Sequence, residues 1–267
     1  MSALKGLNIL DFSGLLPAPY GTRILADMGA NVLRVEAPTR PDMVRVMPPF
    51  DEQGLSAAHG SLNRNKNSIV VDLKTPEGVA IIKKLIETYD IIVEQFRPSV
   101  MSRLGLGYED LKKINPRLIY CAVTGYGQQG VYKNRAGHDL NYLAIAGILD
   151  YTGRKTTGPM PLPIQAADIT GGLYAVTGIL AAVIHRQATG EGQFVDVSLT
   201  DAAMPTIKTI AKSAFIGLLR ITLPYVAKHI RAEEVVASIG TTQGISVGAL
   251  NAAVQSKGIF GLQALQA

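Results

Sequence analysis

Residues 7–36 read LNILDFSGLLPAPYGTRILADMGANVLRVE and contain the pattern of a complete β-α-β unit. The apolar runs 7–12 and 32–36 predict two strands. The segment 20–28 between them has the apolar spacing of a helix, which ends at Gly29. The stretch therefore predicts the first unit of an α/β fold.

The same alternation continues through the first half of the chain. Further strands are predicted at 68–73, 90–94 and 117–124, and a helix is predicted at 79–88. Thr75 precedes this helix as a candidate cap, with Pro76 at its first position. Because the predicted strands are continuous apolar runs, we expect a Rossmann-like, mainly parallel sheet that is covered on both faces.

The second half begins with a Gly-, Pro- and Thr-rich loop at 153–163, followed by sixteen residues without a charge at 169–184. A bilayer-spanning helix needs about 20 apolar residues, so the length favours a buried central helix over a membrane span. A strand is predicted at 194–199. The segment 205–267 is mostly helical in composition.

Composition and charge narrow the function classes. The chain is 47% hydrophobic and 18% charged, which excludes a disordered protein. Residues 1–205 hold 20 basic against 19 acidic side chains, so most of the net charge of +5 belongs to the last 62 residues. Without interleaved aromatic residues this basicity does not predict nucleic-acid binding. The start of the chain does not resemble a signal peptide, and with a single cysteine a reducing, cytoplasmic location is expected.

One glycine-rich segment matches a nucleotide-binding motif, but the sequence around it does not fit a nucleotide-binding loop. Residues 125–130, GYGQQG, match the G-x-G-x-x-G dinucleotide fingerprint directly after a predicted strand. A dinucleotide loop must open an apolar helix, but 131–136 is polar and has no helical period. We therefore interpret the glycines as a tight or mobile loop beside a site, rather than as an NAD site.

Two residues are candidates for acid-base or nucleophilic chemistry. His138 precedes a predicted helix at 140–148, where free backbone N–H groups can stabilise an oxyanion and favour a neutral imidazole. Asp168 opens the charge-free helix, where partial desolvation would raise its pKa. Each residue also has a structural explanation without a catalytic role. His138 can be a surface residue beside Asp139 as a helix cap, and Asp168 can be the N-cap of its own helix. The four histidines lie too far apart in the sequence to predict a metal cluster.

Cationic residues lie next to two predicted strands. Arg64 and Lys66 lie before the strand at 68–73, and Arg97 and Arg103 lie after the strand at 90–94. Cations at strand ends of an α/β sheet are suited to phosphate groups, although surface solvation explains each of them equally well.

A series of motifs in a fixed order makes the first three quarters of the chain resemble a known family. They are GLNILD (6–11), LADMGA (25–30), LNRNK (62–66), EQFRP (94–98), LGLG (104–107), GYGQQG (125–130), AGHD (136–139) and GEGQFVDVS (190–198). Together they resemble the family III CoA-transferases (CaiB/BaiF), and within that family most closely the α-methylacyl-CoA racemases. The resemblance covers residues 1–204, which we expect to form the family's large domain.

The resemblance implies roles for individual residues. His138 and Asp168 would be an acid-base pair that moves the C2 proton of a 2-methylacyl-CoA through an enolate. Asp139 and Tyr142 would lie near the pantetheine or the thioester. The residues implied to contact the CoA phosphates or adenosine are Arg64, Lys66, Arg97 and Arg103. The resemblance implies no metal and no cofactor besides the CoA thioester substrate, and it implies a homodimer.

Two alternatives stay open beside the racemase. Family transferases use the aspartate as a nucleophile and typically lack the histidine, so a CoA-transferase that moves CoA between carboxylic acids needs Asp168 but not His138. Residues 205–267 do not match the family, and Glu233 and Glu234 are not in the context of the racemase glutamate. This divergent segment leaves a truncated, inactive fragment as the third interpretation.

Overall fold

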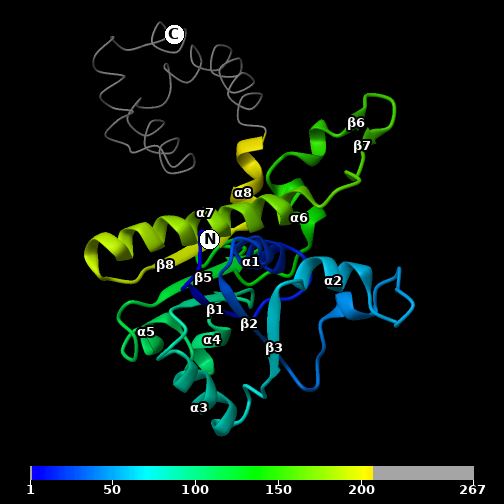
Figure 1. Ribbon diagram of the computed structural model, residues 1–267. Helices are drawn as coiled ribbons and strands as arrows, with labels where there is room; N and C mark the ends of the chain where they lie inside the picture. The colour runs from blue at the N-terminus through cyan, green and yellow to red at the C-terminus, as the bar shows by residue number, and fades with distance from the viewer. Residues whose placement is uncertain (1, 207–267) are drawn as a thin grey trace, which may run out of the picture. The chain divides into compact units, whose positions relative to one another are not determined.

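The computed structural model describes residues 2–206, which form a six-stranded parallel sheet with the strand order β3-β2-β1-β4-β5-β8 (Figure 1). The order changes direction between β1 and β4, which is the position where α/β sheets open a crevice at the carboxyl ends of their strands. The strands are β1 (Asn8–Asp11), β2 (Asn31–Glu36), β3 (Lys66–Val70), β4 (Ile91–Glu94), β5 (Ile119–Thr124) and β8 (Phe194–Ser198), and a separate hairpin pairs β6 (Gly153–Arg154) with β7 (Gly158–Pro159).

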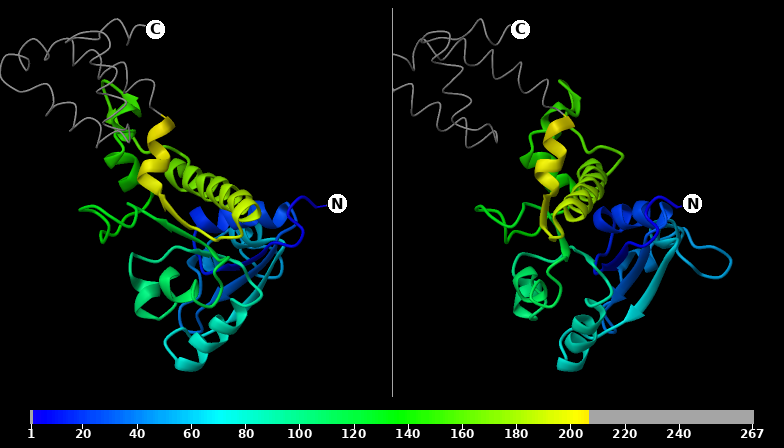
Figure 2. Two further views of the ribbon diagram at one scale, coloured as in Figure 1. Left: turned by 90° about the vertical axis from the view of Figure 1, so that its left-hand side faces the viewer. Right: turned by 60° about the vertical axis from the view of Figure 1, so that its left-hand side comes forward.

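Helices cover both faces of the sheet, and Figure 2 shows the two layers on opposite sides. One layer holds α1 (Pro17–Asp27), α6 (Asp139–Ile145) and α7 (Ala166–Thr189), and the other holds α3 (Pro76–Leu85), α4 (Val100–Arg103) and α5 (Tyr108–Leu111). The remaining helical segments are η1 (Met43–Val46), α2 (Ala57–Asn63), η2 (Leu149–Tyr151), α8 (Leu199–Ala203) and η3 (Met204–Thr206).

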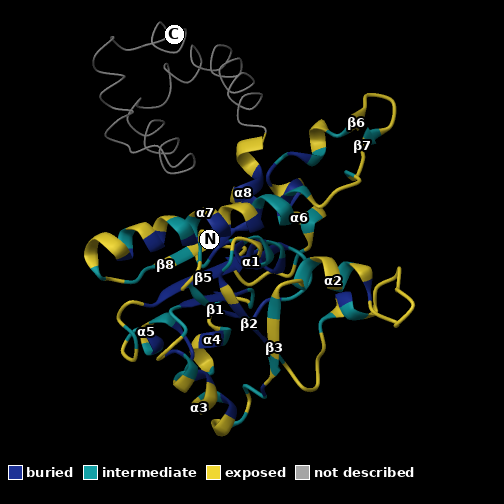
Figure 3. Cartoon of the chain, in the orientation of Figure 1, coloured by how far each residue is buried: buried dark blue, intermediate teal, exposed yellow. Residues whose placement is uncertain are grey.

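Strand β5 shows why the sheet is apolar on both sides. All six of its residues are buried (Figure 3). Ile119, Cys121 and Val123 face the α1, α6 and α7 layer, whereas Tyr120 and Ala122 face the α3 to α5 layer. The continuous apolar runs of the sequence thus result from burial on two faces, which confirms the predicted Rossmann-like α/β architecture.

The element bounds differ from the predictions at a few ends. Helix α1 begins at Pro17, three residues before the predicted start, because proline is well suited to the first helical position. Thr75 is the N-cap of α3, and its side chain accepts a hydrogen bond from Gly78 N, as predicted. Residues 207–267, including Glu233 and Glu234, lie outside the described part of the chain, so the boundary at 204/205 stays a prediction.

Helix α7 is longer than predicted. It spans 24 residues and has the length and apolar composition of a membrane-crossing helix. The prediction that this segment is too short to cross a membrane was therefore wrong. Its packing nevertheless has the predicted character of a central helix. A Cβ atom on Gly172 would lie 2.5 Å from Pro17 O, and one on Gly21 would lie 2.8 Å from Gly172 O. The backbones of α1 and α7 therefore touch, which only glycine permits at these two positions.

Candidate active site

The site is built where α6 and α7 begin, at the carboxyl edge of the sheet. Strand β5 ends at Thr124, and the chain reaches its next helix, α6, at Asp139. Because α7 crosses back over the sheet before the parallel strand β8, its first turn also lies at this edge. The chain thus places Asp139 and Asp168 at two neighbouring helix starts (Figure 1).

Asp139 caps the helix that carries Asp168. Asp168 N donates a hydrogen bond to Asp139 Oδ1 at 3.0 Å, although the two residues are 29 positions apart. The N-cap of α7 is Gln165, which makes no side-chain cap hydrogen bond of its own. Asp168 is therefore in the first turn rather than at the predicted N-cap position, and its carboxyl group is not used as the cap of α7.

The two carboxyl groups differ in their electrostatic environment. Burial, reinforced by the negative charge of Asp139, raises the pKa of Asp168 to about 7. Burial also raises the pKa of Asp139, while the backbone N–H groups of Asp168 and Ala167 act in the opposite direction. Asp168 therefore exchanges protons near neutral pH, which is the range that suits a catalytic carboxyl group.

His138 is the exposed N-cap residue of α6. Its backbone N–H donates to Asn141 Oδ1 at 2.9 Å, and its own carbonyl accepts the first hydrogen bonds of the helix. The imidazole lies on the surface, directly before the Asp139 cap. His138 and Asp139 are adjacent in the sequence. The start of α6 therefore carries both an imidazole and the carboxylate that caps α7.

Tyr142 holds the loop that leads to His138. The phenol O–H donates to Gly137 O at 2.6 Å, and the ring is edge-on to Tyr126 at 5.3 Å between centroids. A Cβ atom on Gly125 would lie 2.4 Å from Tyr142 Cε1, and one on Gly137 would lie 2.7 Å from it. The glycines at the two ends of this loop are therefore required by the close approach of one buried ring.

The predicted cationic residues separate into two groups. Arg97 is exposed between β4 and α4, and Arg103 is exposed at the end of α4, where its Nη1 donates to Ser99 Oγ at 3.0 Å. Arg64 is also on the surface, where its guanidinium binds both carboxylate oxygens of Asp27 at 3.1 and 2.6 Å. These three side chains lie where a phosphate can reach them.

Lys66 differs from the other three cations, because its side chain is only 2% exposed. Its Nζ lies within 3.1 Å of Asp11 Oδ2, Pro19 O, Thr22 Oγ1 and Asn63 Oδ1, so its three N–H donors are occupied. In this structure the Lys66 ammonium pairs with Asp11 inside the protein, and its predicted contact with CoA stays a prediction. Lys66 is the first residue of β3, although the predicted strand began at residue 68, and the sequence contains no sign of a partner 55 residues away.

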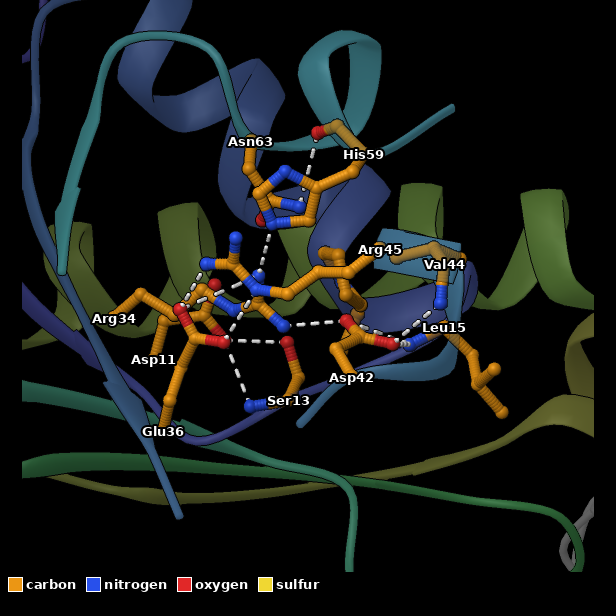
Figure 4. Close-up of polar contacts among 12 residues, drawn as sticks. Asp11, Ser13, Leu15, Arg34, Glu36, Asp42, Val44, Arg45, His59 and Asn63 are labelled. Atoms are coloured by element: carbon orange, nitrogen blue, oxygen red, sulfur yellow. Dashed lines mark hydrogen bonds and ion pairs between the residues drawn. The ribbon is translucent and has the colours of Figure 1, made fainter. Parts of the chain in front are cut away.

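A second buried ion pair joins the same region. Arg34 on β2 pairs with Asp42, its Nη1 lies 3.0 Å from His59 Nε2, and its side chain is 3% exposed (Figure 4). Asp42 also accepts hydrogen bonds from Leu15 N and Val44 N, which fixes the turn after β1. Sequence analysis did not single out this cluster, although charged residues inside an apolar strand such as 32–36 are a usable signal for it.

Glu94 is a further functional candidate that the sequence analysis missed. It ends β4, is 5% exposed, and its Oε2 accepts a hydrogen bond from Phe96 N at 2.6 Å. Burial raises its pKa to about 8, and Asp196 adds to this effect. The sequence shows only a charged residue at the end of an otherwise apolar strand, a pattern that does not reveal whether the side chain is buried.

Comparison with known proteins identifies the family. The model of CoA-transferase family III matches residues 4–218. The chain belongs to CoA-transferase family III.

The relatives of this family III chain include enzymes of two kinds. It is 42% identical over 204 residues to the succinate–glutarate CoA-transferase of Agrobacterium fabrum, an alignment that covers 74% of this chain and 51% of the relative. It is 40% identical over 201 residues to human α-methylacyl-CoA racemase, covering 74% of this chain and 48% of the relative. The family III chain thus spans about half the length of the curated relatives it matches.

Solved structures agree with this assignment. A CaiB/BaiF family protein from Brucella suis superimposes with a TM-score of 0.76 at 36% sequence identity. The superposition covers 80% of this family III chain and 57% of the Brucella chain. The predicted family is therefore confirmed.

Proposed function

We propose that this chain is the catalytic part of a CoA-transferase that moves CoA from an acyl-CoA thioester to a free carboxylic acid. The observation that carries the proposal is the Asp168 carboxyl group, which lies beside Asp139 in the first turn of α7 and is not used as a helix cap. The succinate–glutarate CoA-transferase relative supports the transfer reaction over the racemase reaction expected from the AGHD motif.

Asp168 serves as the nucleophile in this proposal. Its carboxylate attacks the thioester carbonyl, the C–S bond breaks, and the CoA thiolate leaves to give an acyl-aspartyl anhydride. The thiolate then attacks the aspartyl carbonyl, which releases the donor acid as a carboxylate and leaves CoA bound to Asp168 as a thioester. An acceptor carboxylate repeats the two steps in reverse order, which regenerates Asp168 and forms the new acyl-CoA.

The oxyanion that forms at each attack needs donors. Free backbone N–H groups at the start of α6, next to Asp139, are positioned for this role, because the first turn of a helix has N–H groups without intrahelical partners. Arg97 and Arg103 are proposed to contact the CoA phosphates, with Arg64 at the surface as a further contact. No metal or resident cofactor is required, since CoA is itself the group transferred.

The acceptor is proposed to be a dicarboxylic acid of the succinate and glutarate class, because two relatives that are named CoA-transferases for these acids align with the chain. The protein is proposed to act as a homodimer in the cytoplasm. Sedimentation of the purified protein tests whether it is a dimer. A monomer at micromolar concentration would contradict the dimer without bearing on the chemistry of Asp168.

A racemase is the second candidate, and His138 is the observation that favours it. The imidazole is next to the Asp139 cap, and human α-methylacyl-CoA racemase is a relative at 40% identity. In this alternative His138 and Asp168 exchange the C2 proton of a 2-methylacyl-CoA on opposite faces of an enolate. The reaction needs both residues, whereas the transferase needs only Asp168.

Two assays on the purified chain separate these functions. The transferase predicts glutaryl-CoA from succinyl-CoA and glutarate, a CoA adduct in the intact mass of the enzyme, and loss of both in Asp168→Asn, with activity retained in His138→Ala. The racemase predicts C2 deuterium exchange of 2-methylacyl-CoA in deuterated water, lost in both variants. Asp150→Asn, an exposed carboxylate outside the site, is the control. A folded chain that shows neither CoA transfer nor C2 deuterium exchange would overturn both proposed functions. The third interpretation, an inactive fragment, would then apply.

A further inference from the structure

A cavity on the opposite face of the sheet has no role in the proposed transfer reaction. It has a volume of about 370 Å³ and lies between the end of β4, the helices α4 and α5, and the loop after β5. The charged, aromatic and amide side chains in its lining that bear on ligand binding are Glu94, Tyr108, Tyr120, Gln128 and Phe194. Asp139 and Asp168 begin helices of the other layer, so neither of these two carboxyl groups lines the cavity.

The register of the sheet places two carboxyl groups on this face. Glu94 on β4 pairs with Ala122 on β5, and Ala122 pairs with Asp196 on β8. Glu94 and Asp196 therefore flank a small alanine, about 10 Å apart at the backbone given the spacing of neighbouring strands. Asp196 Oδ2 accepts a hydrogen bond from Gln128 N at 3.0 Å, which brings the loop after β5 over the row.

Glu94 has no cationic partner among residues 2–206. Within this part of the chain its side chain accepts a hydrogen bond from Phe96 N at Oε2 and takes part in no ion pair. Lys112, the residue directly after α5, pairs instead with Glu109 at 2.8 Å. A carboxylate that is 95% buried without a counter-charge is costly, because buried charges are normally paired.

Aromatic rings form one wall of the cavity. Tyr120 and Phe194 are cross-strand neighbours that stack at 5.6 Å between centroids, and Tyr108 packs on both rings. Phe194 remains 41% exposed. The faces of aromatic rings carry negative potential, so they attract cations, including quaternary ammonium groups.

Gln128 adds a polar group that is also unsatisfied. Its Nε2 is buried and has no hydrogen-bond partner within residues 2–206. A ligand oxygen in the cavity would satisfy this donor. The wall of the cavity thus offers a carboxylate, aromatic rings and one amide donor.

We propose that this cavity binds a small organic ammonium ion that carries an oxygen acceptor. The ammonium group lies against Glu94 and the aromatic wall, and the oxygen accepts from Gln128. The ligand replaces the counter-charge that the described part of the chain does not provide for Glu94. Gln128 lies in the loop that continues to His138, so an occupied cavity also fixes the beginning of this loop.

The charge of the ligand is tested first, by isothermal titration calorimetry of the full chain with choline. The control ligand is 3,3-dimethylbutan-1-ol, which has the same shape without the charge. We expect choline to bind at least about tenfold more tightly than the neutral alcohol. Equal affinities, or no heat from either compound, would overturn the proposal.

The role of Glu94 is tested by substitution and by pH. Glu94→Gln should weaken choline binding by at least about tenfold, while Glu77→Gln, an exposed carboxylate on α3, should leave it unchanged. Because Glu94 must ionise and its pKa is about 8, wild-type affinity should rise about tenfold between pH 7 and 9, and choline keeps its charge throughout. The other titratable groups that line the cavity are Tyr108, Glu109 and Tyr120, and Asp196 lies two strands from Glu94 on the same face of the sheet. A flat pH profile in the wild-type protein would overturn the proposal even if Glu94→Gln fails to fold.

Discussion

Asp139 Oδ1 accepts the hydrogen bond of Asp168 N at 3.0 Å, so the first turn of α6 provides the cap of α7. One carboxylate therefore has two effects on its neighbour. It stabilises the helix that carries Asp168, and its negative charge holds a proton on the Asp168 carboxyl group to a higher pH.

Substitution of Asp139 separates these two effects. Asp139→Asn keeps the Oδ1 acceptor and removes the charge, so the pKa of Asp168 should fall from about 7 while the cap is retained. Asp139→Ala should remove the cap as well and lower the free energy of unfolding by about 1 kcal/mol. Carboxyl carbon NMR titration and urea unfolding measure the two quantities. An unchanged Asp168 pKa in Asp139→Asn would refute the electrostatic effect.

Asp168 should lower stability at neutral pH. Its pKa rises from 3.8 in the unfolded chain to about 7 on folding, so the folded state binds more protons between these values. The free energy of unfolding therefore falls as the pH rises through this window. Asp168→Asn should remove this fall and stabilise the protein by about 1–2 kcal/mol at pH 8, a value reduced for the partial exposure of the side chain. Urea unfolding at pH 3 and pH 8 checks this, and the two proteins should be nearly equal at pH 3, which is below the unfolded pKa of 3.8.

The pH dependence of transfer follows from the same group. An attacking carboxylate must be ionised, so the turnover number should increase between pH 6 and pH 8 and level off above the Asp168 pKa of about 7. Asp139→Asn should move this rise to lower pH. A turnover number that is constant over this range would contradict Asp168 as a nucleophile with this pKa.

Two neighbouring cations should differ in their contribution to stability. Lys66→Met leaves Asp11 buried without a counter-charge and should cost about 3–5 kcal/mol. Arg64→Met removes a surface contact to Asp27 and should leave the urea midpoint almost unchanged. If Lys66→Met unfolds at the wild-type midpoint and instead weakens CoA binding, the sequence-based assignment of Lys66 to CoA is right.

The contact between α1 and α7 should not tolerate a methyl group. Gly172→Ala places a Cβ atom 2.5 Å from Pro17 O and should destabilise the protein by about 2–3 kcal/mol, since neither backbone can move alone. Gly60→Ala in α2 meets no atom within 4 Å and should be neutral or stabilise by about 0.5 kcal/mol. Thermal unfolding of both variants makes the comparison, and equal effects would show that α1 and α7 separate easily.

The strands were predictable because their signal is local. A run such as 119–123 is apolar at every position, and burial on two faces is the simplest physical reason for that pattern. The bounds of α7 were not predictable in the same way. The charge-free stretch ended before Arg186, but the helix continues because Arg186 Nη1 reaches Asp90 O at 3.1 Å, 96 residues away in the sequence. A contact between residues so far apart in the sequence cannot be predicted from the local sequence pattern.

The candidate site was predictable in its residues but not in their relationships. His138 and Asp168 were selected as helix-start residues, and the structure places both at helix starts. That Asp139 caps the helix of Asp168, and that Lys66 is enclosed, depends on contacts between elements. Glu94 was missed because a single acid at the end of a strand has the same local pattern whether it is exposed or buried.

Helix α7 is held at both ends, by the Asp139 cap at its start and by the contacts of Arg186 with Asp90 near its end. A helix of 24 residues is about 36 Å long, and a shift by one residue would break both attachments at once. In evolutionary terms, the position of Asp168 is therefore difficult to change by gradual steps. New acyl specificities in such a scaffold are expected to arise from exposed loops such as 153–163, which can vary in length without moving the carboxylate.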